Sequence, residues 1–66
     1  MIDIEELERI ILQFNRKELT TVELLEHLLK KGYEINRSFY YNIQKLEKFQ
    51  VIKIDKERKP WLIKKI

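Results

Sequence analysis

The stretch from Asn36 to Phe49 constrains this chain more than any other, because its apolar residues repeat with helical spacing. Phe39, Ile43 and Leu46 recur at i, i+4 and i+7, which is the spacing of one buried helical face. Asn36 is a favourable N-cap, since its side-chain oxygen can accept a free backbone N–H of the first turn. The sequence therefore predicts a helix over 36–49 with an apolar inner face.

The outer face of this predicted helix carries cations, hydroxyl groups and an amide. Its side chains are Arg37, Ser38, Tyr41, Gln44, Lys45 and Lys48. Cations suit phosphates, Arg37 can donate two hydrogen bonds to guanine, and Gln44 can bridge N6 and N7 of adenine. Glu47, the only acid in the stretch, projects near the apolar face instead. The face has the chemistry needed in a DNA major groove, although an ordinary solvated helix surface is the alternative.

Two further helices are predicted before this one. The first covers about 3–15, with Asp3 as its N-cap. Its expected buried stripe is Ile4, Leu7, Ile10, Ile11 and Phe14. The second covers about 21–31, because Thr20 and Glu23 form a capping box at its start and Gly32 can take the left-handed conformation that ends it. We expect it to bury Val22, Leu25, Leu28 and Leu29, with Leu24 at the margin.

After Phe49 the apolar period changes from about 3.6 residues to 2. Strands are predicted over 51–54 and 61–66, with Ile52 and Ile54 on one side of the first. The charged segment between them contains neither Asn-Gly nor Asp-Gly, so we expect a hairpin with a loop of about four residues or more. Leu19, in the connector between the first two helices, could add a short β-bridge.

The charge is divided unequally along the chain. From Met1 to Leu29 there are seven acids and three bases, a net charge of −4, whereas Lys30 to Ile66 holds eleven bases and four acids, a net charge of +7. Such asymmetry indicates an anionic partner for the basic half. It also leaves open a homodimer formed through the acidic half.

Several classes of function are disfavoured by what the sequence lacks. Without Cys there is no disulfide framework or thiolate metal site, and His27 has no second ligand at metal spacing. There is no Ser-His-Asp set, carboxylate cluster or Gly-rich phosphate loop, so we expect no enzyme activity, cofactor or small-molecule substrate. No apolar run approaches the ~18 residues of a membrane span, and the acidic N-terminus is unlike a signal peptide. We therefore expect a cytoplasmic protein. Its length fits one domain over residues 1–66, and a DNA-binding role would locate it at the nucleoid.

Three helices followed by a hairpin resemble the winged helix-turn-helix family, and in size and composition the small regulators of archaea, viruses and plasmids. The resemblance covers nearly all 66 residues and is most specific over 35–54, INRSFYYNIQKLEKFQVIKI. There the predicted helix ends with Leu46 and a charged pair, a turn follows, and the aliphatic pair Val51-Ile52 begins the first strand of the wing. Gln50 departs from the family pattern, because many members have Gly where the backbone turns out of the helix.

The resemblance implies an α+β fold, mainly α: a three-helix winged helix-turn-helix with a C-terminal two-stranded β-hairpin wing. It also implies a transcriptional regulator that binds double-stranded DNA sequence-specifically, with the third helix in the major groove and the wing on the minor groove or backbone. The implied contacts in the third helix are Arg37, Ser38, Tyr41, Gln44, Lys45 and Lys48. Those in the wing are Lys56, Arg58 and Lys59, and the backbone N–H groups of Thr20 and Thr21 are implied phosphate contacts.

We expect Tyr40 and Trp61 to pack at the edge of the core rather than to contact bases.

A winged-helix protein–protein interaction module and a non-specific architectural DNA-binding protein are the alternative functions.

Overall fold

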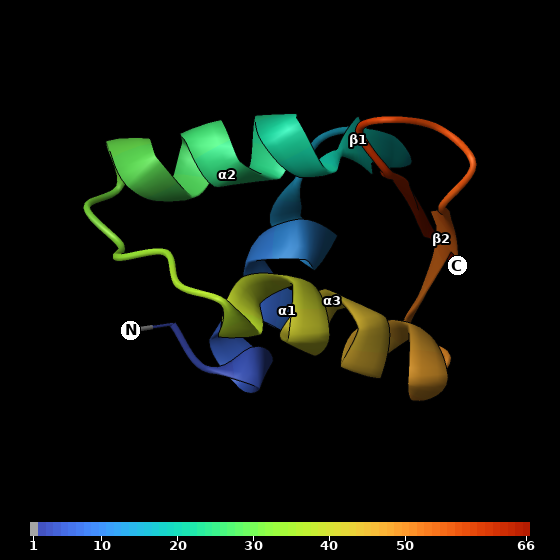
Figure 1. The fold of residues 1–66 in the computed structure, drawn as a ribbon, viewed down its shortest axis with the longest axis horizontal. Helices are drawn as coiled ribbons and strands as arrows, with labels where there is room; N and C mark the ends of the chain where they lie inside the picture. Colours follow the sequence, from blue (N-terminus) through green and yellow to red (C-terminus); the bar gives the residue numbers. More distant parts are fainter. Residues whose placement is uncertain (1) are drawn as a thin grey trace.

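Three helices and three short strands follow one another in the computed structural model, which describes residues 2–66. Their order is α1 (Ile4–Gln13), β1 (Glu18–Thr20), α2 (Thr21–Lys30), α3 (Ser38–Lys48), β2 (Ile52–Asp55) and β3 (Leu62–Lys65). α1 lies behind the space between α2 and α3, and the strands lie at the end of the molecule where α3 ends (Figure 1). The predicted α+β class, mainly helical, is confirmed.

The sheet has one strand more than the predicted two-stranded hairpin. Its order is β1-β3-β2, and both pairs are antiparallel. Ile63 at the centre of β3 pairs with Leu19 on one side and with Ile54 on the other. The bridge expected at Leu19 is thus a full three-residue strand. A strand so short shows no alternation of its own, and its partner is too distant in the chain for local patterning to reveal.

The inner face of α3 is the one that the sequence predicts. Phe39, Ile43 and Leu46 are all buried, and they join the core beside Leu7 and Ile11 of α1. This burial fixes which side of α3 remains in solvent. The outer face is therefore set by the same three residues that hold the helix on the domain.

The predicted inner face of α2 was wrong in phase. Val22 and Leu29 are 44% and 60% exposed, whereas Leu24, which was expected at the margin, is fully buried. Leu28 is buried as predicted. Thr21, which is 1% exposed, completes the buried face. The apolar residues cover a wider arc of this helix than the part that is buried, so their spacing alone did not determine which of them face the core.

Side chains cap the starts of α1 and α2, whereas the N-cap residue of α3 makes no side-chain capping hydrogen bond. Asp3 Oδ1 accepts the N–H of Glu6 at 2.8 Å, and Thr20 and Glu23 form the predicted capping box. α3 begins at Ser38 rather than at 36, and its N-cap is Arg37, which already has a helical conformation, not the predicted Asn36. Asn36 still acts at this end, because its Oδ1 accepts the N–H of Ser38 at 2.9 Å. All three helices are shorter than predicted, α2 by one residue and α1 and α3 by three residues each.

Two helices end in the same left-handed turn. At the end of α2, Gly32 has φ 87°, and the N–H of Tyr33 donates to the Leu28 carbonyl at 3.1 Å. At the end of α3, Gln50 has φ 64°, and the N–H of Val51 donates to the Leu46 carbonyl at 3.1 Å. Both are Schellman motifs, which satisfy carbonyls that the helix leaves free. Gln50 thus makes the turn for which glycine is the better residue.

Exchanging residues at these two turns should change stability in opposite directions. A left-handed conformation costs an L-residue roughly 1–2 kcal/mol, partly offset by the greater freedom of glycine in the unfolded chain. Gln50→Gly should therefore raise the free energy of unfolding by about 0.5–1 kcal/mol, measured by urea denaturation. Gly32→Ala should lower it by a similar amount, because a Cβ there meets no atom within 4 Å and only φ is strained. A Gln50→Gly protein less stable than the parent would contradict the left-handed turn.

Truncating Leu46 tests the inner face of α3. Leu46 is 1% exposed, so Leu46→Ala should lower the free energy of unfolding by roughly 2–5 kcal/mol. Leu29→Ala is the matched control, since Leu29 is 60% exposed and should change stability by less than about 0.5 kcal/mol. Thermal and urea unfolding measure both variants. Equal losses in the two variants would show that the buried faces are assigned wrongly.

Candidate nucleic-acid interface

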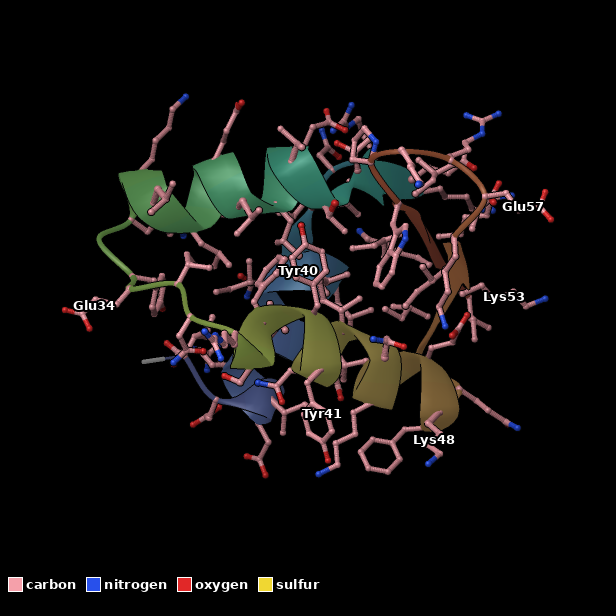
Figure 2. All side chains as sticks on the ribbon, viewed as in Figure 1. Glu34, Tyr40, Tyr41, Lys48, Lys53 and Glu57 are labelled. Atoms are coloured by element: carbon pink, nitrogen blue, oxygen red, sulfur yellow. The ribbon has the colours of Figure 1, made fainter. Side chains whose placement is uncertain are left out.

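The outer face of α3 exposes most of the side chains that the sequence singles out. Arg37, Tyr41, Gln44 and Lys48 are exposed, and Lys45 is half-buried. Figure 2 shows Tyr41 and Lys48 on the side of α3 that points away from α2, whereas Tyr40 points toward α2. Lys45 Nζ lies 5.5 Å from the centre of the Tyr41 ring, so cation and aromatic surface are adjacent on this face.

An open hollow of about 570 Å³ lies between the C-terminal half of α3 and the loop that joins β2 to β3. Its lining residues are Tyr41, Gln44, Lys45, Glu47, Lys48, Phe49 and Lys56. The hollow thus combines four of the six candidates on the helix with one of the three in the loop. Arg37, Ser38, Arg58 and Lys59 lie outside it.

Lys56 connects the loop to α3. Its Nζ lies 3.4 Å from Gln44 Oε1 and 3.6 Å from Glu47 Oε1. The same ammonium lies 5.7 Å from the centre of the Trp61 ring. Glu47 also accepts the backbone N–H of Ile54 through Oε2 at 2.9 Å. Glu47, near the apolar face as predicted, is therefore the residue at which helix and hairpin meet.

The other two loop cations differ from each other. Arg58 Nε lies 3.7 Å from Asp55 Oδ2, while exposed Lys59 has no carboxylate partner among residues 2–66. Two of the three loop cations thus face a carboxylate of the protein, so the loop is less cationic than its sequence suggests. The Asp55–Arg58 pair, three residues apart, was readable from the sequence, whereas the Glu47–Lys56 pair depends on how the hairpin folds back.

The backbone groups at the start of α2 are occupied within the protein. The N–H of Thr20 donates to Glu23 Oε1 at 2.9 Å, and the N–H of Thr21 donates to the Trp61 carbonyl at 3.0 Å. The Glu23 carboxylate also has a lowered pKa, chiefly because it accepts that Thr20 N–H and secondly because Arg16 donates to it. A phosphate here would meet a negative charge and no free N–H from either threonine. We therefore leave Thr20 and Thr21 out of the interface.

Ser38 and Arg37 lie at the N-terminal end of α3. Both the N–H and the Oγ–H of Ser38 donate to Asn36 Oδ1, so this hydroxyl proton serves the helix start. Ser38 lines a separate shallow hollow with Ile2 and Asp3. Arg37 is exposed and has no carboxylate within 4 Å in residues 2–66. Its guanidinium is available to an external anion.

Tyr40 and Trp61 form an aromatic contact beside the loop. Their rings meet edge to face, with centroids 5.4 Å apart, and Tyr40 also contacts Phe39 at 5.1 Å. Trp61 is half-buried, as expected for the edge of the core, but Tyr40 remains 43% exposed. The Trp61 ring also makes a cation–π contact with Lys56, a role that sequence reasoning missed. No local pattern places residue 61 against residues 40 and 56.

The chain matches no protein-family model, no curated protein and no solved structure. Residues 2–66 contain no group of three or more His, Cys, Asp or Glu side chains that could hold a metal ion. No helix in this described part of the chain is long and apolar enough to span a bilayer.

Proposed function

We propose that this protein binds double-stranded DNA through the outer face of α3 and the loop between β2 and β3, as a small winged-helix transcriptional regulator. One observation carries the proposal: the hollow that combines Tyr41, Gln44, Lys45 and Lys48 of the helix with Lys56 of the loop. Helix and loop thus offer one continuous surface to a ligand.

The order of elements supports the winged-helix part of the proposal. A strand follows the first helix, two helices follow that strand, and the chain ends in a hairpin whose last strand lies at the centre of the sheet. The hairpin follows α3 directly and contacts it through Lys56 and Glu47. In this interpretation α3 is the recognition helix and the loop 56–61 is the tip of the wing.

The chemistry of the surface supports DNA as the ligand. Lys45, Lys48 and Lys56 surround the hollow, and its one acid, Glu47, already faces a cation. Beyond the hollow, Arg37 and Lys59 have no carboxylate partners in the described part of the chain and can reach phosphates. Tyr41 and Phe49 add apolar surface that suits thymine methyl groups.

The size of the molecule limits how much DNA one copy can contact. Its extents are 27 × 21 × 20 Å, which is less than one turn of B-DNA at ~34 Å. One copy would therefore read a single half-site. A two-fold dimer, for which the acidic half of the chain is a candidate surface, would read two half-sites about one turn apart.

An acidic protein is the second candidate partner. Tyr41 and Phe49 are 62% and 60% exposed at the hollow, and protein interfaces are enriched in aromatic residues. Such a partner would bind the same cations and aromatic rings. The two functions are separated by competition, because a protein-binding surface would keep its partner when duplex DNA is added.

A salt-titrated assay with random-sequence duplex DNA tests the proposal. Each phosphate contact contributes about −0.9 to the slope of log K against log salt concentration. Lys48→Ala and Lys59→Ala should therefore each make the slope shallower by about one, since both side chains are exposed and free of carboxylate partners.

Lys30→Ala is the matched control for this assay. Lys30 ends α2, at the opposite end of that helix from the hairpin (Figure 1). Its removal should leave the slope unchanged. Absence of duplex binding at low salt, or equal changes in all three variants, would contradict the proposed interface.

A further inference from the structure

The side-chain amide of Gln44 is oriented by Lys56. Lys56 Nζ lies 3.4 Å from Gln44 Oε1. A lysine ammonium has three donors and no acceptor, so the oxygen of the amide, not its nitrogen, faces it. The NH₂ group of Gln44, with its two donors, is left for a ligand in the hollow.

Lys56 is itself held by groups on both sides of the hairpin junction. Glu47 Oε1 lies 3.6 Å from its Nζ, and the Trp61 ring lies beneath it at 5.7 Å. The second carboxylate oxygen, Glu47 Oε2, accepts the N–H of Ile54 at 2.9 Å. Both oxygens of Glu47 thus have partners within the protein. Its charge serves to hold Lys56 beside Gln44.

This arrangement presents donors and few acceptors. A free glutamine suits adenine, because its oxygen accepts from N6 and its nitrogen donates to N7. In this structure one lone pair of the Gln44 oxygen accepts from the Lys56 ammonium, and a donor that approached the other lone pair would come close to a positive charge. Guanine presents two acceptors, O6 and N7, which match the Gln44 NH₂ group and a remaining Lys56 N–H.

We propose that Lys56 and Gln44 together make this surface select guanine over adenine in the major groove. This inference rests on the proposed function and goes beyond it by naming the base. It also replaces the adenine contact that the sequence suggested for Gln44. Phosphate oxygens are acceptors too, so the test must separate a base preference from a general attraction to the backbone.

The test begins with a pool of duplexes whose central sequence is random. The wild-type protein should enrich guanine at a fixed position, and changing that G·C pair to A·T should weaken binding roughly tenfold by fluorescence anisotropy. Lys56→Met keeps a long side chain and removes the ammonium, which frees the Gln44 oxygen. This variant should lose the guanine preference or enrich adenine at the same position.

Lys59→Met is the matched control. Lys59 is a loop cation with no carboxylate partner in residues 2–66, and it does not line the hollow. Its loss should weaken the G·C and A·T duplexes by the same factor and leave the enriched base unchanged. Gln44→Ala should bind both duplexes equally. Circular dichroism would check that each variant is folded, which we expect because all three positions are exposed.

Each contrary result has a definite meaning. A wild-type protein that binds duplexes without preferring guanine, or a Lys56→Met variant with the wild-type preference, overturns the base selection while DNA binding stands. A wild-type protein that binds no duplex at low salt overturns both this inference and the proposed function.

Discussion

The carboxylate of Glu47 joins α3 to the hairpin, and the candidate interface depends on that junction. One oxygen accepts the N–H of Ile54 at 2.9 Å, which ties the end of the helix to β2. The other lies 3.6 Å from Lys56 Nζ, which holds the start of the loop over the helix. Buried Leu46, the preceding residue, holds the same turn of α3 in the core. Together these contacts determine where a loop cation lies relative to the outer face of α3.

The last strand supports this junction from the other side. β3 is the central strand, so the hairpin is bonded to β1 as well as closed on itself. Lys65 of β3 also donates through Nζ to the carbonyls of Leu12 and Phe14, just where α1 ends. A cation at that end suits the helix dipole, and α1 has no basic residue in its own last turn. In this chain of 66 residues, β3 thus contacts α1 through Lys65 and pairs with both β1 and β2.

Local chemistry made much of this structure predictable. The inner face of α3, the Thr20–Glu23 capping box and the turn at Gly32 each depend on residues a few positions apart, and the structure has all three. β1, the phase of α2 and the position of Lys56 depend on distant partners, and sequence reasoning missed or misplaced them. The same division holds for the site. The outer face of α3 followed from periodicity, whereas the occupied N–H groups of Thr20 and Thr21 and the orientation of Gln44 required the fold.

Amide chemical-shift mapping by NMR tests the central claim most directly. Isotope-labelled protein is titrated with duplex DNA at low salt, and the shift of each backbone amide is followed. The account predicts that the largest changes occur in α3 and in the loop 56–61, with little change in α1 and the C-terminal half of α2. Changes confined to α1 and α2, or no change at saturating DNA, would contradict an interface built from α3 and the hairpin.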